Sequence, residues 1–302
     1  EDDEPRYEML ETIREYGRET LRARGELETV TAATAAYYVG LAERAELEGS
    51  GQAYWLPRLI AEHDNFRSAL RWYRERERTD MGLRLTLALM PLWQLRDHQV
   101  EARTWLDTFM ADASDVPAGL RAKGLLWQGM LLLRRTGDDI AASRLFAKAL
   151  VLFRETGNRD GTSETLQAEG DVYRQRREWE RARQRYTESL ELAHQAGNDY
   201  LVAHGNLGLA LCAQEEDRFD GAHHHWQLAL EWAERSKNDA SVALALNSLG
   251  EMARYRNEWD QAERYYERAL HLAKELGSEF RMALALHNLG YVALSRGETS
   301  RA

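Results

Sequence analysis

The sequence predicts an all-α protein built as a solenoid of antiparallel helix pairs, and three observations support this prediction. The 302-residue chain is rich in Ala, Leu, Glu and Arg and contains only four prolines, a composition that favours helices. Small and bulky side chains recur with a period of 40 residues, as in repeat architectures. Within each period the apolar residues are spaced by three and four, as on one face of a helix.

Five columns of matched residues establish the period. They are a column of aromatic residues, a column of alanines, a second column of large aromatic residues, a column of leucines, and a column of glycines that Lys237 interrupts. The members are Trp179, Phe219 and Trp259; Ala142, Ala182, Ala222 and Ala262; Phe146, Tyr186, Trp226 and Tyr266; Leu150, Leu190, Leu230 and Leu270; and Gly157, Gly197 and Gly277. Because one helix pair cannot bury its apolar face alone, stacked neighbours must complete the core.

The clearest unit predicts helix A at Ala243–Arg256 and helix B at Trp259–Leu276. Asn257 and Glu258 form the tight turn between them, and Gly277 occupies the position of a left-handed C-cap after helix B.

Side-chain size within this unit predicts how the helices pack. We expect Gly250 and Ala262 to be small so that the two helix backbones can approach closely. We expect Tyr266 and Trp259 to fill the space between one pair and the next.

The order of small and large residues in this unit resembles the signature of the tetratricopeptide repeat (TPR). The matching residues are Leu246, Leu249, Gly250, Ala253, Ala262, Tyr266 and Ala269. The resemblance implies a right-handed superhelical solenoid in which the A helices line a concave groove. The standard repeat has about 34 residues, so we expect the extra residues to lengthen the helices and the connection from helix B to the next helix A.

The predicted TPR array covers residues 121–302. Its repeats are 121–162, 163–202, 203–242, 243–282 and a partial copy at 283–302, which stops early in its helix B. We therefore expect the chain to be a fragment of a longer protein. Four residues depart from the signature: Glu169 takes an apolar position, Met130 and Ala210 replace the glycine, and Asp139 replaces the aromatic residue.

The region before the array divides into residues 1–30, 31–80 and 81–120. Its predicted helices are Thr12–Ala23, Thr31–Glu48, Ala53–Glu62 and Asp64–Arg76, with a Gly/Ser linker at Glu48–Gln52. Residues 81–120 are predicted to be a degenerate TPR-like repeat, in which Pro91 kinks helix A or delays its start. The stretch Asp112–Pro117 is predicted to be a loop.

Several motifs in this region resemble bacterial signal-transduction ATPases with numerous domains (STAND). They are Arg6–Tyr16, which resembles the end of the winged-helix subdomain, and the connector-like segments Trp55–Leu56, Leu59, Glu62, Asn65–Trp72, Leu89–Trp93 and Glu101–Leu106. The resemblance implies that residues 1–30 are the tail of a winged-helix-like subdomain and that residues 31–80 are a helical connector. This order is that of LuxR-like and AfsR-like transcriptional regulators. ATP and Mg²⁺ are then expected only in a domain N-terminal to residue 1, and no cofactor is expected here.

No motif for catalysis or metal binding is evident in the sequence, so we expect a non-enzymatic chain without a metal site. A phosphate-binding loop, His-Glu-x-x-His and Cys-x-x-Cys are all missing. His223, His224 and His225 are consecutive, but neighbouring helical side chains point about 100° apart and cannot converge on one ion. The single cysteine, Cys212, is expected to be a small buried hydrophobe.

Charge and hydropathy restrict the partners and the location. A net charge of −10 disfavours direct nucleic-acid binding. The longest apolar stretches, Leu85–Trp93 and Leu125–Leu133, are too short and interrupted to cross a bilayer. One cysteine permits no internal disulfide, which fits a cytoplasmic location.

Resemblance to TPR proteins implies that ligand or partner contacts come from fixed positions of helix A. Those positions hold Trp127, Arg134, Arg135, Gln167, Asp171, Arg174, Gln175, Gln214, Glu215, Asn247, Glu251, Arg254, Tyr255, His287 and Tyr291. Arg134, Arg174 and Arg254 share one phase and would suit a carboxylate or phosphate. Alternatively, these arginines are solvated or paired with Asp171 and Glu251. The aromatic residues of the set either contact a ligand or pack between helices.

Two functions are consistent with this sequence. The first is the sensor region of a bacterial ATP-dependent transcriptional regulator, which binds an inducer or partner protein in its groove and contacts the ATPase module of the same protein. The second is a stand-alone scaffold that binds peptides or partner proteins. A nucleotide-binding motif encoded upstream of Glu1 would favour the first.

Overall fold

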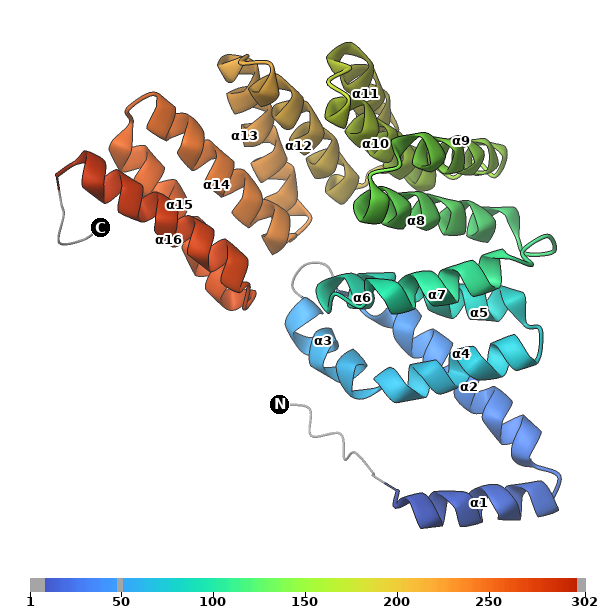
Figure 1. Ribbon diagram of the computed structural model, residues 1–302. Helices are drawn as coiled ribbons and strands as arrows, with labels where there is room; N and C mark the ends of the chain where they lie inside the picture. The colour runs from blue at the N-terminus through green and yellow to red at the C-terminus, as the bar shows by residue number, and fades with distance from the viewer. Residues whose placement is uncertain (1–8, 48–50, 298–302) are drawn as a thin grey trace.

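The computed structural model describes residues 9–47 and 51–297, which contain sixteen helices and no β-strand. The all-α prediction is therefore confirmed. Helices α8 to α16 follow one another in an arc, and α1 to α7 lie at one end of it (Figure 1). The first residues of the winged-helix motif, part of the predicted linker and the predicted start of a last helix B fall at 1–8, 48–50 and 298–302, outside the described residues.

The array consists of four helix pairs and a final helix A. The pairs are α8 (Ala118–Thr136) with α9 (Asp139–Glu155), α10 (Arg159–Gln175) with α11 (Trp179–Ala196), α12 (Asp199–Glu215) with α13 (Phe219–Arg235), and α14 (Asp239–Tyr255) with α15 (Trp259–Glu275); α16 (Glu279–Ser295) follows them. The extra residues of the 40-residue unit lengthen the helices, as predicted. The prediction that they also lengthen the connection from helix B to helix A is wrong, because only two or three residues separate successive helices here.

Each helix pair begins three or four residues before its predicted start, and a repeated asparagine explains the difference. Asn158, Asn198 and Asn238 precede α10, α12 and α14 at a spacing of 40 residues. Each side chain accepts a hydrogen bond from the backbone N–H three residues later, at 2.8, 3.1 and 2.8 Å. An N-cap of this kind satisfies a free amide in the first turn and fixes where the helix begins.

The turns between helices require left-handed backbone. Gly277 has φ +61° after α15, and Lys237 occupies the equivalent position after α13 with φ +54°. The predicted C-cap column is therefore confirmed, including its exception. Asn257, in the A-to-B turn, has φ +62°.

The glycines of the A helices make room for aromatic rings. A methyl group on Gly250 would lie 2.5 Å from Cε1 of Tyr266, so this glycine makes room for the ring. The ring of Tyr186 lies between Gly170 of its own repeat and Gly208 of the next, where methyl groups would approach to 2.7 and 2.4 Å. Bulky residues thus fill the space between pairs, as predicted.

Helix α8 of the first repeat is shifted by one residue relative to the 40-residue pattern of the other A helices. A methyl group on Gly129 would lie 2.4 Å from the ring of Phe146, so Gly129 has the role that Gly170 has in the next repeat. Only two residues, Gly137 and Asp138, connect α8 to α9, whereas three connect α10 to α11. The prediction that Met130 replaces the glycine is therefore wrong, because the shorter turn shifts α8 relative to α9.

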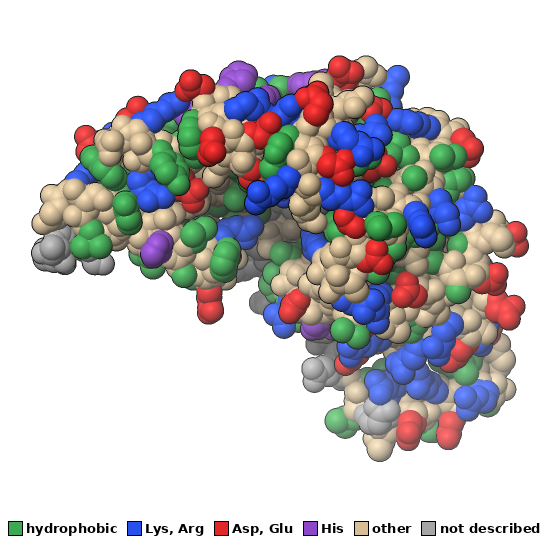
Figure 2. Space-filling model, turned by 45° about the horizontal axis from the view of Figure 1, so that its top comes forward, with side chains coloured by type: hydrophobic (Ala, Val, Ile, Leu, Met, Phe, Trp, Pro, Cys, Tyr) green, Lys and Arg blue, Asp and Glu red, His purple; other side chains and the backbone are tan. Residues whose placement is uncertain are grey.

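The array curves with its A helices on the inside. Helices α8, α10, α12, α14 and α16 contact one another in succession, and each B helix packs against the following A helix. Among the described residues the B helices make no comparable contacts with one another. Close spacing of the A helices and wide spacing of the B helices produce the arc. Figure 2 shows the molecule hollowed beneath it.

The N-terminal region consists of α1 (Glu11–Ala23), α2 (Leu27–Arg44), α3 (Gln52–Ala61), α4 (His63–Glu75), α5 (Thr79–Ala88), α6 (Met90–Leu95) and α7 (Gln99–Met110). Helices α2 to α7 share one hydrophobic core with the start of the array, and α1 packs against α2. Leu59, Phe66, Leu83 and Leu106 belong to this core, so connector and degenerate repeat pack as one unit. Pro91 lies in the first turn of α6 and separates it from α5, as predicted.

Candidate ligand groove

The predicted groove residues lie on the five A helices, but they differ greatly in their availability to a ligand. The deepest ones connect neighbouring helices. The Gln167 side-chain amide donates to the carbonyl of Leu201 at 2.9 Å, and Asn288 donates to Oδ1 of Asn247 at 2.9 Å. All of these side chains are buried. Gln167 and Asn247 therefore hold neighbouring A helices together, and their burial leaves little of them available to a ligand.

A connected polar network spans α10, α11 and α12. The Tyr186 hydroxyl donates to Oδ1 of Asp171 at 2.7 Å. Arg174 lies 3.9 Å from the same carboxylate and donates to Oε1 of Glu215 at 2.5 Å. The alternative in which Arg174 is paired is therefore correct, because carboxylates from two helices neutralise its charge.

The equivalent region of α14, α15 and α16 is left open. The guanidinium carbon of Arg254 lies 5.3 Å from the ring centroid of Tyr255 and 4.6 Å from that of Tyr291, which are cation–π distances. Its Nε atom is buried and makes no hydrogen bond within the described residues, as is also true of Nε of Arg174, and the buried Tyr266 hydroxyl lies beside Arg254 without a well-formed hydrogen bond. Tyr255 and Tyr291 are 65% and 46% exposed, so their rings are accessible to a ligand.

Burial shifts the pKa values of the groups around Arg254. It raises the pKa of the Tyr266 phenol to about 12. Burial also raises the pKa of Glu251, and a hydrogen bond donated by Asn247 at 3.1 Å and the charge of Arg254 only partly oppose this effect. We call Glu251, Arg254, Tyr255, Tyr266 and Tyr291 the α14 subsite.

The first repeat contributes less than predicted. Trp127 is half-buried and packs against the N-terminal core rather than standing free in the groove. The one-residue offset of α8 removes Arg134 from the row of Arg174 and Arg254, and Leu133 takes the equivalent place. Arg134 and Arg135 are exposed at the end of α8.

The remaining predicted residues have mixed positions. Gln214, between the two arginines of the row, accepts a hydrogen bond from Nε1 of Trp226 at 3.2 Å. Gln175 and His287 are exposed. Two further polar groups, the Tyr266 hydroxyl and the buried Asn288, were not among the predicted groove residues. Tyr266 occupies a core position of the repeat pattern, and Asn288 lies next to His287 but outside the family positions, so neither gave a signal in the sequence.

The clefts of the outer surface follow from the repeat itself. A cavity of about 680 Å³ is lined by Glu234, Lys237 and Arg268 from α13, the following turn and α15. A second, of about 380 Å³, is lined by residues that precede these by 80, among them Arg154, Gly157 and Glu188. These two clefts occupy equivalent places between B helices of repeats 80 residues apart, so they follow from the repeat.

The histidine run and the cysteine have structural surroundings. His225 Nδ1 lies 3.1 Å from Oδ1 of Asn206, and burial lowers the pKa of His225. Cys212 is fully buried, as predicted, and burial raises the pKa of its thiol to about 11. No helix in the described part of the chain is both long enough and apolar enough to cross a membrane.

Comparison with known proteins supports the repeat assignment. Residues 121–195 and 201–275 match the tetratricopeptide repeat family. A protein of Mycobacterium tuberculosis assigned as an HTH-type transcriptional regulator is 31% identical over 161 residues, which are 51% of this chain and 18% of that protein. The chain thus spans less than a fifth of the length of this curated relative.

Two solved structures share the fold at low sequence identity. One is a STAND protein of Pyrococcus horikoshii with a tetratricopeptide repeat sensor, with TM-score 0.55, 14% identity, and coverage of 80% of this chain and 38% of that one. The other is a Rap protein complexed with competence and sporulation factor, with TM-score 0.59, 14% identity, and coverage of 91% and 74%.

Proposed function

Since residues 121–195 and 201–275 of this chain are tetratricopeptide repeats, we propose that the chain is the sensor and protein-interaction region of an ATP-dependent transcriptional regulator. It binds a peptide or partner protein in the concave groove formed by its A helices. The regulator relative and the STAND structure with a repeat sensor support the regulatory part of this proposal. The Rap protein complex supports a ligand held by a helical array of this shape.

The observation that carries the proposal is an arginine without a carboxylate partner in the α14 subsite. Arg254 forms no ion pair among the described residues, whereas its counterpart Arg174 donates to Oε1 of Glu215 at 2.5 Å. Buried polar groups are nearly always hydrogen-bonded, and an unmatched group costs about 1–3 kcal/mol. Because Arg254 is only partly buried, a carboxylate or backbone carbonyl of a ligand can reach its guanidinium group.

The chemistry of the subsite favours a peptide. Arg254 presents a planar fork to a carboxylate, and Tyr255 and Tyr291 present flat, exposed rings to an apolar side chain. Aromatic residues and arginine are the residue types that dominate binding energy at protein interfaces. We therefore infer that the ligand presents an acidic group beside an apolar side chain.

A library of short synthetic peptides, each prepared with a free C-terminal carboxylate and as the amide, tests this proposal by fluorescence polarisation. We expect a subset of peptides to bind, and Arg254→Ala to weaken their binding by about tenfold or more, since a charge-assisted hydrogen bond contributes about 1.5–3 kcal/mol. Arg256→Ala is the matched control, because Arg256 is exposed at the end of the same helix and pairs with Asp220 at 2.8 Å. Equal affinities of the two variants would refute the assignment of the subsite.

The regulatory role requires that the ligand bind two states of the full regulator unequally. Deletion of α8 to α16 from the full-length protein should change its ATPase activity, and addition of the ligand should change the activity of the intact protein only. If neither perturbation alters ATPase activity, the stand-alone scaffold is the better description. A gene that encodes no nucleotide-binding motif upstream of Glu1 would lead to the same conclusion.

A further inference from the structure

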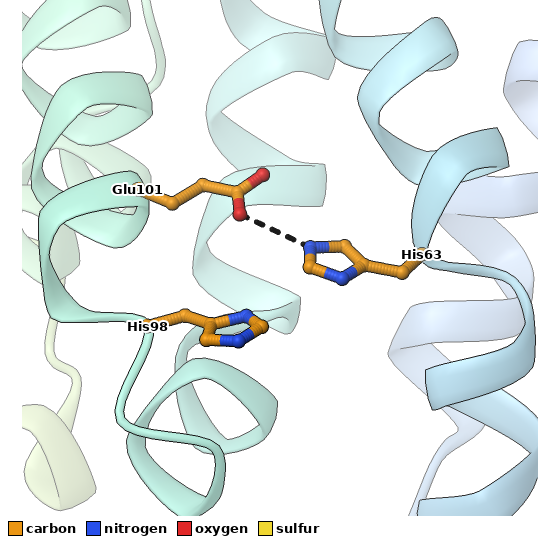
Figure 3. A group of neighbouring side chains, drawn as sticks. All are labelled: His63, His98 and Glu101. Atoms are coloured by element: carbon orange, nitrogen blue, oxygen red, sulfur yellow. Dashed lines mark hydrogen bonds and ion pairs between the residues drawn. The ribbon is translucent and has the colours of Figure 1, made fainter.

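Two histidines and a glutamate from separate segments converge between α4 and α7 (Figure 3). His63 is the first residue of α4, His98 is the N-cap of α7, and Glu101 lies in the first turn of α7. Their potential ligand atoms all lie within 4.8 Å of one another. Among the described residues this is the only group of three or more His, Cys, Asp or Glu side chains with such spacing.

The spacing suits one transition-metal ion. Two ligands held tetrahedrally at about 2.0–2.1 Å from zinc lie about 3.4 Å apart, and His63 Nε2 lies 3.1 Å from Oε2 of Glu101. The rings of His63 and His98 are nearly parallel, with an interplanar angle of 22° and centroids 5.1 Å apart. Small rotations of these half-buried side chains would bring both ring nitrogens to an ion beside Glu101.

We propose that His63, His98 and Glu101 bind a divalent transition-metal ion of the zinc class, with water in the fourth position. Two imidazoles and one carboxylate form a donor set typical of zinc sites that keep an open position. The same set is a poor match for Mg²⁺ or Ca²⁺, which take oxygen ligands. Because the ligands come from α4 and α7, the ion would cross-link the connector to the degenerate repeat.

Arg67 is not one of the proposed ligands, but it positions the carboxylate of Glu101. Its Nε donates to Oε1 and its Nη2 to Oε2 of Glu101, both at 2.7 Å. This two-pronged contact fixes the orientation of the carboxylate before an ion arrives.

An open cavity gives the site access to solvent. It has a volume of about 760 Å³, and His98 and Glu101 line it together with Asp64, Asp97, Arg67 and Arg71. Asp64 and Asp97 line this entrance, and Arg67 and Arg71 offset their negative charge.

Titration of the purified 302-residue chain with Zn²⁺ in an isothermal calorimeter tests the proposal. We expect one Zn²⁺ per chain and no measurable binding of Mg²⁺. His98→Asn and His63→Gln should each weaken Zn²⁺ binding by at least about tenfold, a loss already produced by removal of outer-shell partners. Asparagine is a favoured N-cap residue, so His98→Asn should preserve α7.

The matched control is His271→Asn, because His271 lies 3.5 Å from Glu275 on one exposed helix face without a third ligand. This variant should bind Zn²⁺ like the wild type, and an equal loss in all three variants would overturn the proposal. Co²⁺ substitution provides a readout that needs no variant. A four-coordinate site gives strong visible absorption, whereas the weak spectrum of six-coordinate Co²⁺ would also overturn it.

Discussion

Two tyrosines at the same position of different repeats allow a direct test of the polar network described above. Tyr186 and Tyr266 lie 80 residues apart, and both rings are fully buried against glycines of an A helix. The hydroxyl of Tyr186 donates to Asp171 at 2.7 Å, whereas that of Tyr266 has no partner within the described residues. Tyr186→Phe therefore removes a hydroxyl that is hydrogen-bonded, and Tyr266→Phe removes the equivalent hydroxyl that is not.

The structure sets the expected magnitudes. A hydrogen bond to a carboxylate contributes about 1.5–3 kcal/mol, but the side chain of Asp171 is 50% exposed and water can replace the lost phenol. We therefore expect Tyr186→Phe to lower the free energy of unfolding of its repeat by about 1 kcal/mol. Tyr266→Phe should be neutral or stabilising by up to about 1 kcal/mol, because it removes a buried hydroxyl that lacks a partner.

Amide hydrogen exchange read by mass spectrometry is the suitable assay, because repeat arrays unfold in segments and a single midpoint can hide a local change. Exchange should accelerate in α10 and α11 of Tyr186→Phe and remain unchanged or slow in α14 and α15 of Tyr266→Phe. Equal acceleration in both variants would refute the reasoning, since loss of a hydroxyl would then matter regardless of its partner.

Three further predictions concern the packing, the turns and the pH dependence of the fold. Gly208→Ala should destabilise the array by about 1–3 kcal/mol in urea unfolding, because the new methyl group would lie 2.4 Å from the Tyr186 ring, whereas Gly17→Ala, with no atom within 4 Å, should stabilise α1 by up to about 1 kcal/mol. Lys237→Gly should raise the melting temperature, since φ +54° strains a lysine by about 1 kcal/mol, and an unchanged value would contradict this. Burial lowers the pKa of His204 to about 4, so the unfolded chain takes up this proton first as the pH falls. The contribution of His204 to the free energy of unfolding is fully present above about pH 6.5, and about 3 kcal/mol of it is lost as the pH falls towards 4. His204→Gln should remove this part of the pH dependence in urea titrations.

The repeat pattern predicted the fold but not the points where helices begin. The alanine column and the aromatic column of Phe146, Tyr186, Trp226 and Tyr266 are buried, and the glycine column is left-handed, where the period places them, whereas Phe219 of the other aromatic column is 41% exposed. The helix starts were misplaced by four residues in most repeats because the asparagine column at Asn158, Asn198 and Asn238 was overlooked, although N-cap residues are readable from sequence. The matched columns do not reveal the shift of α8. The residue that is missing lies in the turn between α8 and α9, and the B helices keep the 40-residue spacing.

The groove was less predictable than the fold. Family positions correctly pointed to the A helices, yet Gln167 and Asn247 hydrogen-bond to neighbouring helices and are buried. Arg174 and Arg254 share a phase, but Glu215 neutralises the first, while the second lies between two tyrosine rings. Which arginine is paired depends on side chains from the next A helix, and one repeat read alone does not contain them.

The linear sequence by itself determined that this chain is a helical array, because small and bulky side chains repeating every 40 residues can be buried only by stacking. Only the tertiary structure decided which polar groups meet across helices. His63 and His98 are 35 residues apart, and no motif links them to a common ion. They come together because α4 packs against α7, and contacts of that kind depend on the geometry of the whole fold rather than on local spacing.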